Sequence, residues 1–124
     1  MTETLTGLLA GKTVRRLGFG TMRLTGPGIW GPPSNEQNAI DLLRKAVDSG
    51  VQHIDTADAY GPDVAEPLIR KALYPYTDDL IIATKGGFTR QGPGRWTPCG
   101  VPAYLRQCVE MSLRRLNVEA IDLY

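Results

Sequence analysis

Cysteine and histidine are scarce in this sequence, which limits the chemistry that it can support. Two cysteines and one histidine occur among 124 residues. A structural zinc site takes about four ligands of these types, and a disulfide framework takes several cysteine pairs. We therefore expect neither a metal site nor a disulfide. Cys108 lies on the apolar face of a predicted helix, where packing is the favoured role, and Cys99 lies in a predicted loop, where we expect a free thiol.

A strong charge of one sign and a long apolar run are also missing. The net charge is +1, with 14 basic and 13 acidic residues, so no long-range field attracts nucleic acid or an anionic membrane. No apolar run approaches the roughly 18 residues of a membrane span, and the N-terminus lacks the pattern of a secretion signal. With 42% hydrophobic residues, the chain is typical of one globular, cytoplasmic domain without nucleic-acid or membrane partners.

Strand-like and helix-like patterns alternate along the chain. Short apolar runs predict strands, whereas apolar residues three or four positions apart predict amphipathic helices. On this basis we expect strands at about 13–20, 51–55, 80–85 and 120–124, and helices at 35–49, from 63 or 67 to 73, and at 102–117. The β-α-β-α-β-α-β order implies parallel strands joined by right-handed crossovers, as in the first four β/α units of a (β/α)8 barrel.

Particular residues predict where these helices begin and end. Ser34 followed by Gln37 forms a capping-box pattern before the first helix, and Gly50 suits the left-handed position after it. The second helix begins either after Asp63 as its cap or with Pro67 as its first residue, because proline cannot donate an intrahelical hydrogen bond.

Two loops rich in glycine and proline are candidates for binding. Residues 86–100 contain five glycines and two prolines, which favours an irregular binding loop in which Trp96 lines a pocket. In the loop at 26–33, Trp30 either walls the same pocket or only pins that loop. Gly18 and Gly20 invite a dinucleotide-fold reading, but Arg23 stands where the third glycine belongs and a loop follows, which disfavours that fold.

Titratable residues stand at the ends of the second and third predicted strands. Asp55 and Lys85 point to one face of the sheet and should meet at its rim, with Tyr60 in the loop that follows Asp55. An ammonium beside a phenol favours the phenolate, and a carboxylate keeps the ammonium charged, so such a tyrosine can donate a proton to a carbonyl oxygen. The alternative is an ion pair that only sets strand register. We expect His53 to be a hydrogen-bonded core residue and Asp58 a turn residue that bonds its own loop.

Three motifs carry a resemblance to a known family. Residues 18–22 (GFGTM), 53–61 (HIDTADAYG) and 83–85 (ATK) resemble, in order and spacing, the N-terminal half of aldo-keto reductases. The resemblance covers about Val14 to Tyr124 and looks closest to the bacterial branch with a Gly/Pro-rich insertion, here residues 26–33. It implies that residues 1–124 are the N-terminal half of a TIM (β/α)8 barrel of the aldo-keto reductase type.

The resemblance also implies an activity and its residues. We expect an NAD(P)H-dependent oxidoreductase that reduces an aldehyde or ketone, with Tyr60 as general acid and Asp55 and Lys85 as its partners. The matching contacts to the nicotinamide of NADPH, or of NADH, are Gly20, Thr21, Met22 and Asp55. Trp30 and Trp96 are the candidate substrate-pocket residues.

Other interpretations of the sequence stay open. Lys85 at a strand end suits a Schiff-base aldolase on the same barrel. A non-catalytic nucleotide-sensing or truncated barrel is the third reading, because the family's fourth catalytic residue, a histidine, follows an Asp-Leu-Tyr strand and Tyr124 is the last residue here. A half barrel has open strand edges, so we expect residues 1–124 alone to be inactive, and either to self-associate or to occur only as part of a longer chain.

Overall fold

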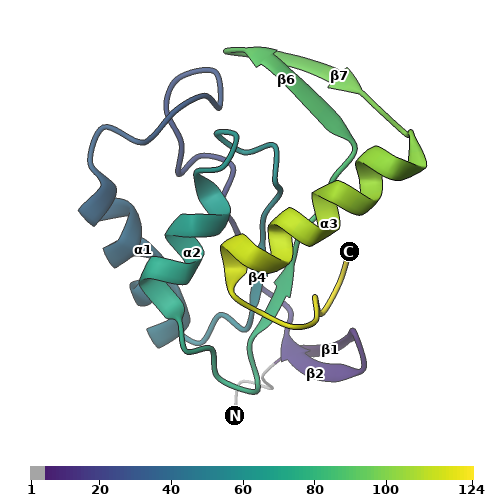
Figure 1. Ribbon diagram of the computed structural model, residues 1–124. Helices are drawn as coiled ribbons and strands as arrows, with labels where there is room; N and C mark the ends of the chain where they lie inside the picture. The colour runs from purple at the N-terminus through teal and green to yellow at the C-terminus, as the bar shows by residue number, and fades with distance from the viewer. Residues whose placement is uncertain (1–4) are drawn as a thin grey trace.

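The computed structural model describes residues 5–124. Within residues 5–124, three helices cover a small parallel sheet, and a β-hairpin lies at each end of it (Figure 1). In chain order the elements are β1 (Thr6–Leu9), β2 (Lys12–Arg15), β3 (Phe19–Gly20), α1 (Glu36–Asp48), β4 (His53–Asp55), α2 (Ala65–Leu73), β5 (Ile81–Ala83), β6 (Phe88–Gly92), β7 (Arg95–Pro98) and α3 (Pro102–Leu116).

The central sheet is parallel and has the strand order β3-β4-β5. Gly20 lies opposite Asp55, and Asp55 lies opposite Ala83. The expected succession of parallel β/α units is confirmed. Because the strands run in parallel, their carboxyl ends share one edge, and this edge carries the candidate catalytic residues.

The strand expected at 13–20 is wrong as a single element. Its first part, β2, pairs antiparallel with β1, and only β3 joins the central sheet. The hairpin forms because Ala10 and Gly11 both adopt positive φ angles, of 48° and 76°, which is the geometry of a type I′ turn. The sequence reasoning missed β1 because it identified no alternating pattern before residue 13.

The β1–β2 hairpin packs against the amino ends of the central strands. The Arg15 backbone N–H donates to Gln52 Oε1 at 3.0 Å, and Lys12 Nζ donates to the Asp78 carbonyl oxygen at 2.8 Å. Figure 1 shows this hairpin at the end of the molecule opposite β6 and β7. It therefore covers the end of the sheet that lies away from the candidate site.

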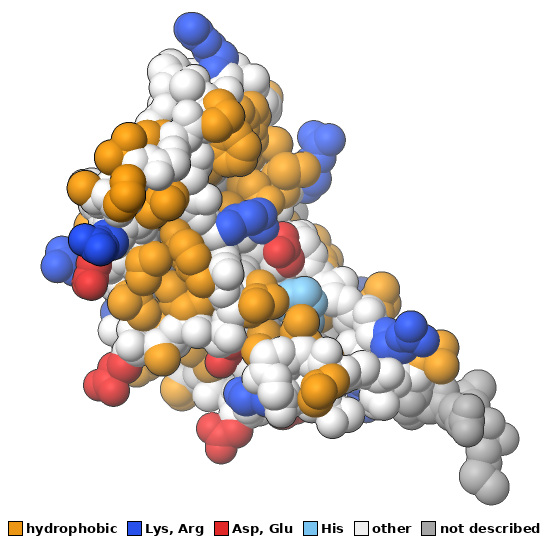
Figure 2. Space-filling view, turned by 90° about the vertical axis from the view of Figure 1, so that its right-hand side faces the viewer, with side chains coloured by type: hydrophobic (Ala, Val, Ile, Leu, Met, Phe, Trp, Pro, Cys, Tyr) orange, Lys and Arg blue, Asp and Glu red, His pale blue; other side chains and the backbone are white. Residues whose placement is uncertain are grey.

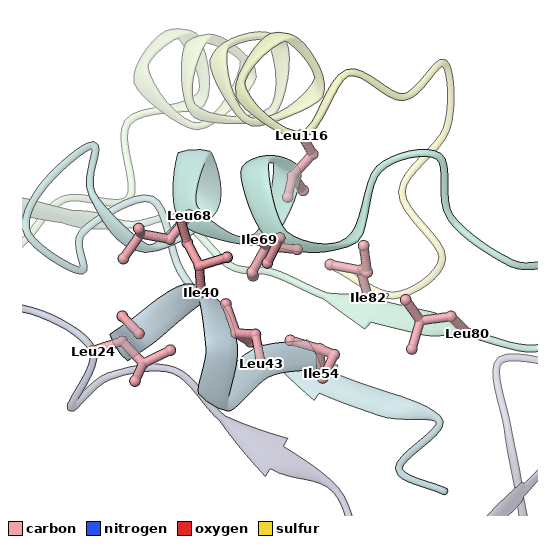
Figure 3. Packing of buried hydrophobic residues seen from close by; sticks show 11 residues of the cluster. Leu24, Ile40, Leu43, Ile54, Leu68, Ile69, Leu80, Ile82 and Leu116 are labelled. Atoms are coloured by element: carbon pink, nitrogen blue, oxygen red, sulfur yellow. The ribbon is translucent and has the colours of Figure 1, made fainter. Parts of the chain in front are cut away.

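The hydrophobic core lies between the sheet and the two helices α1 and α2. Figure 3 shows Ile54 and Ile82 pointing toward side chains of these helices, and Leu43 and Ile69 are fully buried there. Ile54 and Ile82 are partners in register, so the alternate residues, among them Asp55, lie on the other face. That face corresponds to a barrel interior.

The N-cap of the first helix lies one residue later than predicted. Asn35, not Ser34, is the N-cap: it has extended backbone angles and its Oδ1 accepts from the Asn38 N–H at 3.0 Å. Gln37 does not complete a capping box, since its amide donates to Asp41 instead. The end of the helix is confirmed, with Gly50 at a φ of 100°.

The second helix begins between the two predicted starts. Its first residue is Ala65 and its N-cap is Val64, so Pro67 is the third helical residue. Proline is tolerated there because the first N–H groups of a helix have no intrahelical acceptor. Asp63 lies outside the helix with a φ of 60°.

The C-terminal third of the chain holds one confirmed and two wrong predictions. Helix α3 begins with Pro102 and ends before Asn117, as expected, and Asn117 itself is left-handed. The region 86–100 is not an irregular loop, because β6 and β7 form an antiparallel hairpin. The strand expected at 120–124 is, within residues 5–124, a single parallel bridge between Leu123 and Ala83.

The side chains of the two cysteines differ in exposure. Cys108 is buried on the inner side of α3, which confirms its packing role, and Cys99 is half-buried. No helix among residues 5–124 is long and apolar enough to cross a membrane.

A buried carboxylate joins α2 to β5 and α3. Glu66 is 1% exposed; its Oε1 accepts from the Thr84 hydroxyl and its Oε2 from Arg115 Nε, both at 2.6 Å. Arg115 also pairs with Asp63 at 2.7 Å. Thr84 immediately precedes Lys85, so this network fixes the end of β5 where the candidate lysine emerges.

We predict that Glu66→Ala destabilises residues 1–124 by about 3 kcal/mol, because it leaves the partly buried Arg115, with its side chain 14% exposed, with only an exposed partner. Urea unfolding at one fixed protein concentration measures the change. Glu36→Ala is the matched control, since Glu36 pairs with Lys71 at the exposed surface, and it should cost less than about 1 kcal/mol. Equal losses in the two variants would contradict a special role for Glu66.

Candidate active site

The ends of β4 and β5 bring an acid and an amine into direct contact. Lys85 Nζ lies 3.0 Å from Asp55 Oδ2 and 3.1 Å from Asp55 Oδ1, and it donates to the Thr56 carbonyl oxygen at 2.7 Å. Both side chains are about half exposed. The predicted meeting of Asp55 and Lys85 at the rim is therefore present, and the ammonium has an acceptor for each of its three protons.

Tyr60 reaches the same place from the loop after β4. Tyr60 is 9% exposed, and its ring lies beneath the ammonium, with Lys85 Nζ 5.2 Å from the ring centroid. The next residue, Gly61, has a φ of 118°, and a Cβ there would lie 2.4 Å from the Val64 side chain. Glycine is thus required after the tyrosine, because the chain turns sharply there into α2.

The turn after β3 supports Asp55 from the other side. The Thr21 N–H and hydroxyl both donate to the Asp55 carbonyl oxygen at 3.0 Å, and the Thr21 side chain is fully buried. Thr21 therefore fixes the Asp55 backbone rather than facing the solvent. Gly20 is exposed beside Asp55, and a Cβ built there would meet no atom within 4 Å.

A cavity of about 290 Å³ opens next to these groups. Its volume is close to the lower limit of small-ligand pockets, which is about 300 Å³. Figure 2 shows the side of the molecule on which the only histidine is visible, where hydrophobic side chains gather above a basic and an acidic side chain. The cavity is lined mostly by apolar groups, from Met22, Ala57, Asp58, Ala59, Tyr60, Lys85, Gly86, Phe88 and Trp96.

The two tryptophans have different positions relative to this cavity. Trp96 lines it and meets the Tyr60 ring edge to face, with centroids 6.3 Å apart. Trp30 is not among the described lining residues. Its backbone forms a bridge with Gly61, as expected for a residue that pins the loop at 26–33.

Arg90 is a residue that the sequence reasoning missed. Its guanidinium lies 3.6 Å from the Trp96 ring centroid and donates to the Ala59 carbonyl oxygen at 2.6 Å. No motif marks it, because its partners are carbonyl oxygens of segments far away in the sequence. Only the hairpin that replaces the expected irregular loop brings them together.

His53 and Asp58 depart from their expected roles. His53 is half-buried, and its Nε2 has no hydrogen-bond partner among residues 5–124, so the expected bond is missing at that atom. The Asp58 carbonyl oxygen accepts from the Asp63 N–H at 3.3 Å, as a turn residue should, but Asp58 also lines the cavity, and its Oδ1 is buried without a hydrogen-bond partner among residues 5–124. Within the described chain, no group of three or more His, Cys, Asp or Glu side chains is placed to hold a metal ion.

With this geometry in view, the comparison with known proteins defines the class. The model of the aldo/keto reductase family matches residues 16–124, and the chain belongs to that family. It is 55% identical over 111 residues to an uncharacterized oxidoreductase of Schizosaccharomyces pombe, and 49% identical over 115 residues to pyridoxine 4-dehydrogenase of Escherichia coli. These matches cover 90% and 93% of this chain but 36% and 40% of the relatives.

Solved structures agree with this assignment. An aldo-keto reductase from Bacillus halodurans in its holo form superposes with a TM-score of 0.79 at 31% identity, over 96% of this chain and 38% of the other. An aldo-keto reductase from Klebsiella pneumoniae in complex with NADP and acetate gives 0.65 at 25% identity, over 88% and 34%. The chain therefore has part of the aldo-keto reductase barrel and spans about a third to two-fifths of these relatives.

We predict a pH-dependent effect of Asp58→Asn. Burial raises the pKa of the Asp58 carboxyl above its ordinary 3.8, although the Cys108 thiol beside it opposes the change. An acid whose pKa is higher in the folded than in the unfolded chain stabilises the fold at low pH. This contribution to the free energy of unfolding is lost as the pH rises from about 3.8 through the folded-state pKa. The free energy of unfolding of the variant minus that of wild type, both measured with urea, should thus be larger at about pH 7 than at about pH 3.

Asp48→Asn controls for the loss of an exposed acid in the same assay. A difference between Asp58→Asn and wild type that is the same at both pH values would contradict the burial of this carboxyl.

Proposed function

We propose that this chain supplies the proton donor and its two partners for an NAD(P)H-dependent reductase of aldehydes or ketones. The observation that carries the proposal is the Lys85 ammonium, held by Asp55 and placed 5.2 Å from the Tyr60 ring centroid. These groups lie beside an apolar cavity, which suits a carbonyl compound better than a charged ligand.

Each residue has a distinct role in this proposal. Tyr60 donates a proton to the carbonyl oxygen as the carbonyl carbon is reduced. Lys85 stabilises the phenolate that Tyr60 leaves behind, because an ammonium favours a nearby negative charge. Asp55 keeps that ammonium charged and in position. Membership of the family and the similarity to pyridoxine 4-dehydrogenase support these roles.

The hydrogen bonds of Lys85 favour this role over that of an aldolase nucleophile. A Schiff-base lysine must lose its proton and present a free lone pair. Here Lys85 Nζ donates to both carboxylate oxygens of Asp55 and to the Thr56 carbonyl oxygen, so it is held by three acceptors and is not free to approach a substrate carbon.

The described residues fit the reactive end of a nicotinamide cofactor. Gly20 leaves open space above the backbone beside Asp55, so a flat ring can approach there without a clash, and Met22 lies at the adjacent cavity wall. Thr21 acts through the Asp55 backbone. When bound, NADPH would supply the hydride; we propose NADPH first, with NADH as the alternative, because a similar reductase was solved with NADP.

Pyridoxine is the first alcohol to test in the oxidising direction. The relative named for it shares 49% identity over nearly all of this chain. An aromatic ring would also suit the cavity, where Phe88, Trp96 and Tyr60 meet edge to face, since aromatic rings favour such arrangements. Whole-protein activity needs the rest of a barrel, so the test joins this chain to one.

We predict that a chimera in which residues 1–124 replace the matching segment of the E. coli pyridoxine 4-dehydrogenase oxidises pyridoxine with NADP⁺. Tyr60→Phe should lower kcat by about 10²- to 10⁴-fold, because one general acid–base group is lost, and should leave the Kd for NADPH nearly unchanged. Steady-state kinetics and a fluorescence titration measure the two quantities.

Tyr104→Phe is the matched control, because the Tyr104 hydroxyl donates to the Phe88 carbonyl oxygen and does not line the cavity. It should keep kcat within about threefold. Wild-type turnover in the Tyr60→Phe chimera would exclude Tyr60 as the acid.

We also predict that the isolated polypeptide 1–124 self-associates and binds NADPH weakly. The central sheet exposes strand edges, and Leu17, Leu123 and Tyr124 are exposed apolar residues. Pairing of two copies would cover these edges. Sedimentation together with NADPH fluorescence titration gives the answer: a monomer that binds NADPH tightly and reduces an aldehyde would contradict this expectation.

A further inference from the structure

Arg90 on β6 joins three segments around the cavity. Its Nη1 donates to the Ala59 carbonyl oxygen at 2.6 Å and to the Ile29 carbonyl oxygen at 2.9 Å; its Nη2 donates to the Gly28 carbonyl oxygen at 3.0 Å. Its Nε donates to the Arg95 carbonyl oxygen across the hairpin at 2.7 Å. One side chain thus connects the loop at 26–33, the loop that carries the candidate acid, and the β6–β7 hairpin.

The guanidinium also lies against both tryptophans of the chain. Its central carbon is 3.6 Å from the Trp96 ring centroid and 5.7 Å from the Trp30 ring centroid. Trp96 in turn meets the rings of Tyr60 and Phe88 edge to face, at 6.3 and 5.6 Å. The cavity wall is therefore stacked on Arg90.

The partners of Arg90 are unusual for an arginine near a candidate active site. Among residues 5–124 it forms no ion pair, and all its hydrogen bonds go to backbone carbonyl oxygens. A planar fork with five donors can hold several carbonyl groups in fixed directions, which a lysine cannot do. The arrangement indicates a residue that fixes loops rather than one that binds an anion.

We propose that Arg90 is a positioning residue that fixes Tyr60 through the Ala59 carbonyl group and Trp96 through its ring, and so sets the shape of the carbonyl pocket. The inference rests on the proposed function of Tyr60. Ala59 immediately precedes Tyr60, so a shift of that carbonyl group moves the phenol. Misplacing a reacting group by about 1 Å costs up to about 10²-fold in rate.

Kinetics of the chimera described above test the proposal. Arg90→Gln should lower kcat/KM for pyridoxine by about 10- to 100-fold, because the acid and the ring wall lose their fixed positions. The KM for NADP⁺ should change less than about twofold, because no described cofactor contact involves Arg90. Arg90→Lys should restore part of the lost kcat/KM, since it keeps a cation over Trp96 but not the planar set of guanidinium N–H donors. Arg95→Gln, an exposed arginine on the same hairpin, is the matched control and should be neutral.

A second measurement separates this proposal from the function of the site. Trp30 and Trp96 are the only tryptophans in the sequence, so the fluorescence of residues 1–124 reports directly on the surroundings of Arg90. Arg90→Gln should increase acrylamide quenching by about twofold, as expected for rings released toward water, while Arg95→Gln should not.

The outcomes are distinguishable. If the unsubstituted chimera has no activity, the proposed function fails, and the quenching result still decides whether Arg90 holds the rings. Unchanged quenching in Arg90→Gln, or kinetics equal to those of Arg95→Gln in an active chimera, would overturn the proposal. A third outcome would also contradict the proposal: a lower thermal midpoint of the Arg90→Gln chimera together with equal losses of kcat/KM for pyridoxine and for NADP⁺. A smaller folded fraction alone lowers both values of kcat/KM.

Discussion

The parallel pairing of β4 with β5 is the constraint on which the candidate site depends. It places Asp55 opposite Ala83, two residues before Lys85, so the carboxylate and the ammonium emerge at one edge and meet at 3.0 Å. The surrounding structure maintains this pairing. Ile54 and Ile82 bury the other face under α1 and α2, as Figure 3 shows, and a register shift of one residue would turn these apolar side chains toward the cavity.

The sequence predicted the parts of this arrangement that depend on local pattern and strand alternation. The apolar faces of α1 and α3, the direction of Asp55 and the contact between Asp55 and Lys85 all follow from periods of 3.6 and 2 residues. Tyr60 was assigned through the family resemblance. The helix cap at Asn35 was missed because two adjacent residues both suit a cap, and backbone angles decide between them.

Several features that the sequence did not predict depend on partners outside the local pattern. The β6–β7 hairpin contains glycines and prolines that are typical of loops, and its strands are fixed by pairing with each other and by Arg90. The contacts of Arg90 with Ala59 and Gly28 join residues 31 and 62 positions apart. No local pattern encodes such contacts, because backbone carbonyl oxygens are present at every residue.

The central proposal is that this chain is part of a reductase in which NADPH gives a hydride to the carbonyl carbon and Tyr60 gives a proton to the oxygen. Transfer of deuterium from NADPH in which both hydrogens of the reactive nicotinamide carbon are deuterium, measured in the chimera with an aldehyde substrate, tests it most directly. The account predicts that the alcohol carries the deuterium on carbon, and that the same reaction with unlabelled NADPH in D₂O leaves that carbon unlabelled, because Tyr60 delivers its proton to oxygen. Carbon-bound label from D₂O, or an alcohol without label from the cofactor, would contradict the account.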